Sequence, residues 1–182
     1  MYLYCVLFSL FAVAVSTSCV CTTVSCPSVG ENTLVMGKGT AKITYEYDLY
    51  GEYPVVVKAT GTITPSDLDQ GTDTTSCTQQ YARLLEDDGN DNCDAGHILA
   101  HRLGGYGNQP INIFPQDLSI NRGAYAQYED RIYHCMLGGA TQGDFNWIFT
   151  YSNNTRTKPH AVQYSVSFNG GNCGKITSMF SN

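Results

Sequence analysis

The chain has 182 residues, of which 42% are hydrophobic, and its formal net charge at pH 7 is −6. This length and apolar content suit one domain with a core of ordinary size. The acidic balance argues against tight binding to nucleic-acid phosphates, which normally uses clustered Lys and Arg. An enzyme that must release its product tolerates weak binding, so this balance does not exclude a nuclease.

The first 15 residues form an uncharged apolar run, and the small residues Ser16-Thr17-Ser18 follow at once. This pattern predicts a secretory signal peptide over residues 1–18. The alternative is a membrane anchor, but spanning a bilayer takes about 20 apolar residues. We therefore expect a secreted, extracellular protein with no membrane anchor in its mature form.

Eight cysteines favour an oxidising compartment and disulfide stabilisation. Cleavage after Ser16 or Ser18 leaves seven of the eight, and cleavage after Cys19 leaves six, so the pairing stays open. Residues 19–40 are rich in Cys, Ser, Thr and Gly without periodicity, which predicts an irregular arm before a folded domain over 41–182. The chain contains no Cys-x-x-Cys pair, which argues against a four-cysteine zinc site.

Alternation of apolar and polar residues predicts a strand over 43–49 and a second over 55–63, paired as an antiparallel hairpin. The segment 66–78 is expected to be a polar loop, and 81–86 suits a short helix or a short strand. The acidic stretch 86–91 is expected to be a solvated loop. A helix is predicted over 121–137, ended by Gly138-Gly139, because apolar residues recur at spacings of three and four: Tyr125, Tyr128, Ile132 and Cys135.

Two further alternating runs, 145–151 and 162–168, predict strands after that helix. The order of strands, one helix and more strands is typical of an α+β domain built on an antiparallel sheet.

Polar residues gather between 94 and 129, and some suit a metal site. Asn121 and Glu129 are eight residues apart, so on one ideal helix they lie within about 80° of each other. Their oxygen atoms suit a hard cation. The alternative is that Asn121 caps the helix and Glu129 is a surface carboxylate.

Three elements in order make the segment more specific: Asp94-Ala95-Gly96-His97, then Asn112-Ile113-Phe114-Pro115-Gln116, then Asn121…Tyr125…Glu129. Together they resemble the DNA/RNA non-specific endonucleases, one of the ββα-metal nuclease families. The intervals of nine residues from Asn112 to Asn121 and eight from Asn121 to Glu129 also match. The resemblance implies a ββα-metal finger within a nuclease domain over 41–182, and DNA, RNA or both as substrate.

The resemblance also implies roles for these residues. His97 is the expected general base, oriented by a backbone carbonyl in the turn that follows it. Asn121 is the expected ligand of one Mg²⁺, with Mn²⁺ as an alternative, and Glu129 is expected to hold the waters of that ion. Asn112 is included among the catalytic candidates, and with Asp94 it is expected to brace the site. The products implied are 5′-phosphate and 3′-hydroxyl ends.

One position departs from the family pattern. The signature carries Arg where this chain has Ala95, so the contact to the scissile phosphate must come from elsewhere. A subfamily with Asp-Ala-Gly-His and a later Arg-x-Gly-Gly looks similar to this chain, which has Arg102-Leu103-Gly104-Gly105. Arg102 is therefore the first candidate for that contact, and Arg122 is the second.

Two other functions remain open. Ala95 and the negative charge would also suit a secreted nucleic-acid-binding protein that has lost catalysis. His97 and His101, four residues apart, would face the same way on a helix and suit a zinc hydrolase. The sequence does not decide between DNA and RNA or between single and double strands, and it leaves the oligomeric state open.

Overall fold

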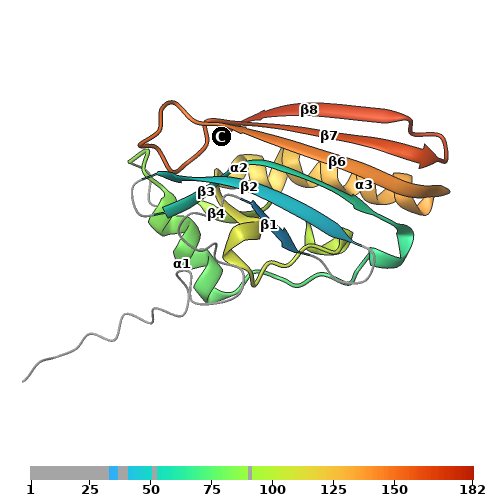
Figure 1. Ribbon diagram of the computed structural model, residues 1–182, viewed down its shortest axis with the longest axis horizontal. Coiled ribbons are helices and arrows are strands. Elements are labelled where there is room, and N and C mark those ends of the chain that lie inside the picture. Colours follow the sequence, from blue (N-terminus) through green and yellow to red (C-terminus); the bar gives the residue numbers. More distant parts are fainter. Residues whose placement is uncertain (1–32, 37–40, 51–52, 90–91) are drawn as a thin grey trace, which may run out of the picture.

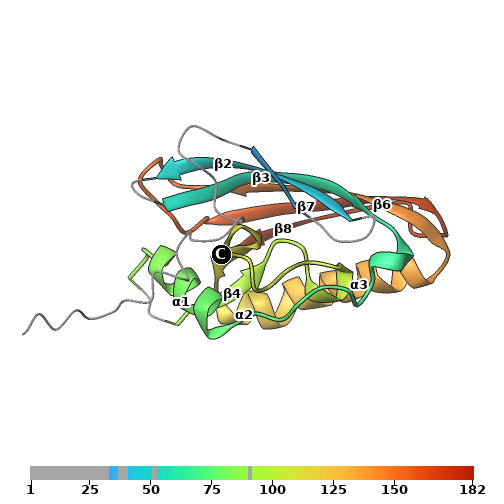
Figure 2. The same cartoon turned by 60° about the horizontal axis from the view of Figure 1, so that its bottom comes forward.

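The computed structural model describes residues 33–36, 41–50, 53–89 and 92–182. These residues form a six-stranded antiparallel sheet in the order β1-β2-β3-β6-β7-β8. The helices and a separate two-stranded pair, β4-β5, lie on one face of this sheet (Figures 1 and 2). The expected α+β class with an antiparallel sheet is confirmed. The strands of the large sheet are β1 Thr33–Met36, β2 Lys42–Tyr50, β3 Tyr53–Ile63, β6 Ala140–Thr150, β7 Ala161–Gly170 and β8 Lys175–Ser181.

The expected hairpin of β2 and β3 is present. Ile43, Tyr45 and Tyr47 of β2 point into the core as the alternation predicts. In β3 the expected alternation is wrong at one place, because the register shifts between Glu46 and Tyr47. Val57 is the extra residue of this bulge, so Val55 and Val56 are both buried.

Two strands were not expected from the sequence. β1 lies inside residues 19–40, so the prediction of a wholly irregular arm is wrong for Thr33–Met36. The remainder of that arm and the predicted signal peptide lie outside the described residues. β8 forms the far edge of the sheet beside β7. Its inward row is Ile176, Ser178 and Phe180, and the central serine weakens the apolar alternation.

Helix α1 (Ser76–Leu85) settles the open assignment of 81–86 as helix. It begins inside the segment expected to be loop, because Thr75 and Thr78 cap it reciprocally. The Thr78 amide donates to Thr75 Oγ1 at 3.2 Å, and the Thr75 amide donates to Thr78 Oγ1 at 2.9 Å. These bonds satisfy backbone donors that a helix start leaves free.

The helix expected over 121–137 is interrupted. A short α2 (Leu118–Ile120) leads into a π-helical turn (Asn121–Tyr125), and α3 proper spans Ala126–Leu137. Gly123 has φ −111° and ψ −106°, outside the helical region. The expectation that Asn121 and Glu129 lie within about 80° of each other on one ideal helix is therefore wrong across this turn. The expected stop at Gly138-Gly139 is confirmed, with Gly139 at φ 100°.

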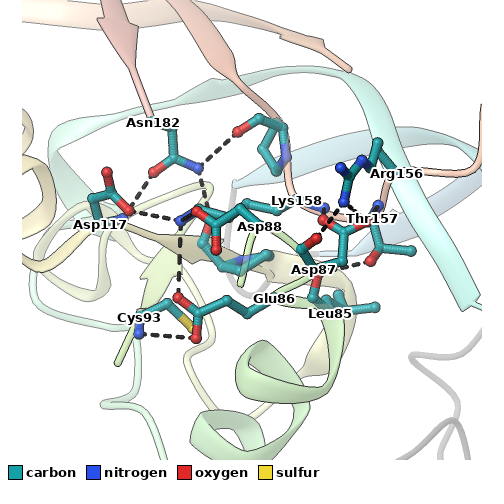
Figure 3. A network of polar contacts seen from close by, with 12 residues as sticks. Leu85, Glu86, Asp87, Asp88, Cys93, Asp117, Arg156, Thr157, Lys158 and Asn182 are labelled. Carbon is teal, nitrogen blue, oxygen red and sulfur yellow. Dashed lines mark hydrogen bonds and ion pairs between the residues drawn. The ribbon is translucent and has the colours of Figure 1, made fainter. Parts of the chain in front are cut away.

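The expectation of a solvated loop over 86–91 is wrong for Glu86 and Asp87, whereas Asp88 is exposed and residues 90–91 lie outside the described residues. Glu86 is buried, and Asp87 and Asp88 contact the loop between β6 and β7 (Figure 3). The Asp87 carboxylate accepts the backbone amides of Thr157 and Lys158 at 3.0 and 3.2 Å. These carboxylates fasten the end of α1 to the loop between β6 and β7.

A disulfide joins Cys135 of α3 to Cys173 in the turn between β7 and β8. Cys77 is also disulfide-bonded, whereas Cys93 is buried and free. Expected disulfide stabilisation is thus confirmed. Within the described ranges, each helix is too short or too polar to cross a membrane.

We expect Cys135→Ala together with Cys173→Ala to lower the free energy of unfolding by about 4 kcal/mol. The reason is the 38-residue separation of the two cysteines, because opening a loop of that size restores about that much chain entropy to the unfolded state. Urea unfolding followed by circular dichroism measures the change. A double variant as stable as the parent would contradict the prediction.

Candidate active site

The three sequence elements come together as two strands and a helix. β4 (Asp94–His97) pairs antiparallel with β5 (Ile113–Gln116), and the Asn121 turn and α3 follow. Short 3-10 turns at His101–Leu103 and Pro110–Asn112 shape the loop between the two strands. This is the ββα arrangement that the sequence predicts.

A cleft of about 200 Å³ opens between the end of β4 and the first turn of α3. It brings together three of the predicted residues, His97, Arg102 and Glu129. The complete lining is His97, Ala100, His101, Arg102, Ala126, Glu129 and Asp130. Asn121 and Asn112 are not part of this lining.

The His97 ring is held by a carbonyl group. Nε2 lies 3.3 Å from the backbone oxygen of Thr72. Because a carbonyl can only accept, the proton of a neutral ring is on Nε2, and Nδ1 keeps the free lone pair. A carbonyl was expected in the turn after His97, and that position is wrong, since Thr72 lies upstream, before α1. Gly107 packs so closely on the ring that a Cβ there would collide with Nε2.

Burial lowers the pKa of His97 below its ordinary value of 6.5. The Thr72 carbonyl and Asp73 act in the opposite direction, and the neighbouring His101 lowers the pKa further. The ring is therefore neutral at pH 7, which is the form that accepts a proton.

Asn121 is fixed by Asp94 at the other end of β4. Its amide Nδ2 donates to Asp94 Oδ2 at 3.1 Å. Within the described residues, no hydrogen bond engages the amide oxygen, which is the atom that would bind a cation. Arg122 holds both oxygens of the same carboxylate at 2.7 and 2.8 Å, and this bond lowers the pKa of Asp94. Arg122 is thus engaged in orienting Asp94.

Glu129 lines the cleft, and one of its carboxylate oxygens, Oε1, is buried without a hydrogen-bond partner among the described residues. Burial raises the pKa of Glu129 well above its ordinary value. A carboxylate oxygen without a partner is costly in a protein interior. An oxygen of this kind, like the amide oxygen of Asn121, is of the type that a hydrated hard cation such as Mg²⁺ accepts.

Arg102 lines the cleft on the side of α3. Its guanidinium lies 3.9 Å above the ring of Tyr133 and donates to Asp130 Oδ1 at 2.9 Å. Ala95 is instead buried with Cys93 and Ile113 in a small apolar cluster. Of positions 95, 102 and 122, only position 102 supplies an arginine to the cleft lining.

Asn112 is fully buried, and its side chain contacts other groups of the protein. Its amide nitrogen donates to Leu99 O at 3.0 Å and Tyr106 O at 3.3 Å. Its amide oxygen accepts from Leu99 N and Tyr45 Oη, both at 2.9 Å. These contacts suit the expected brace for the loop after His97, and the inclusion of Asn112 among the catalytic candidates stays a prediction.

The zinc alternative needs His97 and His101 on one helix. His97 instead ends β4 and His101 begins a 3-10 turn, and their ring centroids are 6.1 Å apart. Over the described ranges, no three His, Cys, Asp or Glu residues converge as metal ligands. The helical geometry behind this alternative is wrong.

Sequence reasoning missed several groups around His97. Thr72, Asp73 and Gly107 come from segments that carry no motif, and Tyr125 Oη donates to the His97 carbonyl at 3.3 Å. The first two fall in the segment 66–78, whose polar composition indicates only a loop. Their proximity to His97 depends on the fold.

Comparison with known proteins places this arrangement in a family. The family described as DNA/RNA non-specific endonuclease matches residues 32–167, which is most of the chain. The chain belongs to the DNA/RNA non-specific endonuclease family. Membership confirms the resemblance drawn from residues 94–129 and the enzyme class expected from it, an endonuclease.

A curated relative is the probable deoxyribonuclease RhsA of Dickeya dadantii (strain 3937). The two are 36% identical over 121 residues, which is 66% of this chain and 8% of the relative. The chain therefore corresponds to a small part of that protein.

Solved structures of NucA from Streptococcus agalactiae share the fold. With a magnesium ion bound, NucA matches at TM-score 0.61 and 14% identity over 83% of this chain and 78% of its own. Without metal it matches at TM-score 0.55 and 13% identity over 80% and 72%.

We expect Gly107→Ala to displace the His97 ring and to lower the free energy of unfolding by about 1–3 kcal/mol through overpacking. The ¹⁵N chemical shifts of the imidazole should show a changed tautomer population. Thr72→Ala is the control, since it keeps the carbonyl that the ring contacts. Unchanged His97 shifts in Gly107→Ala would contradict the geometry.

Proposed function

We propose that this chain is a secreted, metal-dependent, sugar-nonspecific endonuclease that hydrolyses phosphodiester bonds in DNA, RNA or both. The observation that carries the proposal is the neutral His97, with Nδ1 free, in a cleft shared with Glu129 and Arg102. Two of the similar proteins support the proposal, since one is a probable deoxyribonuclease and the other, NucA, has a solved structure with a magnesium ion bound.

In the proposed mechanism His97 Nδ1 takes the proton of the attacking water. The Thr72 carbonyl keeps the ring in the required tautomer and orientation. Arg102 contacts the phosphate, after leaving Asp130 or while still paired with it. Asp94 orients the amide of Asn121, and Asn112 keeps the loop after His97 in place.

Mg²⁺, with Mn²⁺ as a substitute, would be held by the amide oxygen of Asn121, and Glu129 would accept hydrogen bonds from the hydration shell. When bound, the cation offsets the charge that develops on the phosphate and the departing 3′-oxygen. The products are then 5′-phosphate and 3′-hydroxyl ends.

Disulfide bonding supports the proposed secretion. Cys135 pairs with Cys173, and Cys77 is also bonded. Such bonds form and persist in oxidising compartments.

We expect the chain to nick plasmid DNA or cut RNA in Mg²⁺, and EDTA to abolish the reaction. His97→Ala should lower the rate by about 10²–10⁴, the usual contribution of a positioned general base. Gel assays of both substrates measure this. Full cutting by His97→Ala would contradict the mechanism, and binding without cleavage in Mg²⁺ and Mn²⁺ would favour the inactive binding protein.

The pH dependence follows from the lowered pKa of His97. The neutral ring is the base, so kcat/KM is lost as pH falls through this pKa and is constant above it. We expect the midpoint of the acid limb below 6.5, the ordinary histidine value. Initial rates at saturating Mg²⁺ between about pH 4.5 and 8 measure it. A midpoint above the ordinary value would contradict the assignment.

A further inference from the structure

Lys158, in the loop between β6 and β7, has a buried ammonium held by carboxylates from two distant segments (Figure 3). Its side chain is 3% exposed. Nζ lies 2.6 Å from Asp88 Oδ2 and 2.6 Å from Asp117 Oδ1, with Glu86 Oε1 at 3.8 Å. Burial by itself lowers the pKa of Lys158, but the bonds to Asp117 and Asp88 outweigh it, so the group is a permanent cation.

Asp117 stands immediately before α2, where an aspartate normally caps the helix with its own side chain. Here the side chain makes no such bond and instead reaches Lys158. The backbone carbonyl of Asp117 accepts the amide of Asn121 at 2.8 Å and that of Ile120 at 3.1 Å. One residue thus joins the buried ammonium to the backbone of the proposed metal ligand.

A second contact holds Asp117 in the same place. Its amide donates to Asn182 Oδ1 at 2.8 Å. The Asn182 amide in turn donates to Pro159 O at 2.9 Å and Pro115 O at 2.8 Å. Asp117 is therefore fixed through its side chain to Lys158 and through its backbone to Asn182, which in turn bonds the loop that carries Lys158.

The position of Asn121 depends on two anchors. Asp94 holds its side-chain amide, and Asp117 holds its backbone at the start of the π-helical turn. Mg²⁺ requires near-ideal ligand geometry, so a shift of this turn displaces the amide oxygen from its useful position.

We propose that Lys158, acting through Asp117, is a positioning residue for Asn121 and hence for the metal site. The inference rests on the proposed function, because it takes Asn121 as the metal ligand. Lys158 touches neither the substrate nor the cation in this arrangement. Its effect is on metal affinity.

Asp88 provides a matched control for Asp117. Both carboxylates lie 2.6 Å from Lys158 Nζ, and their side chains are 36% and 43% exposed. Asp88 has no described contact to the Asn121 turn. Neutralising either one removes a similar ion pair, but only one of them is connected to the metal ligand.

The experiment compares Asp117→Asn with Asp88→Asn in the full chain. Mn²⁺ alone is the probe, with free Mn²⁺ measured by electron paramagnetic resonance, and the half-saturating Mg²⁺ for plasmid nicking is measured in parallel. We expect Asp117→Asn to weaken both about tenfold, with kcat at saturating metal close to the parent, and Asp88→Asn to stay within about twofold. Asp117→Glu, which keeps the charge, should restore most of the affinity.

Equal shifts in both Asn variants, or an unshifted Asp117→Asn beside an Asn121→Ala that no longer binds Mn²⁺, would overturn the positioning role. Failure of the proposed function looks different, because Asn121→Ala would then bind Mn²⁺ like the parent. Thermal unfolding sets a temperature at which every variant is folded. If Asp117→Asn does not fold, Lys158→Arg and Asp117→Glu are compared instead. Both variants keep the charges of the ion pair, so both should keep metal affinity near that of the parent. A loss of metal affinity in one variant and not in the other would overturn the role.

Discussion

The arrangement of the cleft depends on one buried amide, that of Asn112. Asn112 is 0% exposed, yet both amide atoms are bonded, to the loop after His97 and to Tyr45 of β2 in the large sheet. A buried amide without partners costs about 1–3 kcal/mol, so the loop has one conformation that satisfies it. Because Tyr45 belongs to β2, this bond also sets the distance between the β4-β5 pair and the large sheet. Burial raises the pKa of Tyr45, which keeps its hydroxyl as a donor.

An aromatic cluster supports the other wall of the cleft. Tyr125 and Tyr128, on the helical side, contact Tyr164 and Phe180 of β7 and β8 with ring centroids 4.8–5.7 Å apart. Trp147 of β6 lies against Tyr164 at 4.8 Å. This packing explains why the tyrosine stripe is buried and why α3 crosses the sheet where it does. Glu129 lies beside the stripe, at the boundary between the cluster and the cleft, so its unpartnered oxygen is a consequence of the same packing.

Several of the carboxylates that make the chain acidic form ion pairs within the fold. Glu86, Asp88 and Asp117 surround the Lys158 ammonium, and Asp94 is held by Arg122. Pairs of this kind are weak evidence for stability in themselves, because desolvation offsets much of the attraction. These ion pairs fix the positions of their side chains, since burying one charged group without its partner would cost free energy. An acidic chain can therefore still present Arg102 and a neutral histidine at its cleft.

The sequence by itself determined the α+β class, four of the sheet strands, the end of α3 and the identity of His97, Asn121, Glu129 and Arg102 as candidates. Local periodicity and motif spacing contain that information, because both depend on residues close together along the chain. Only the tertiary structure decided that the His97 ring contacts the Thr72 carbonyl, which groups Asn112 bonds, and that Lys158 is connected to Asn121 through Asp117. Each of these depends on hydrogen bonds between segments far apart in the chain: 25 residues separate Thr72 from His97, 41 separate Asp117 from Lys158, and 67 separate Tyr45 from Asn112. Such contacts follow from how buried polar groups find partners in the folded chain, and no local pattern records that choice.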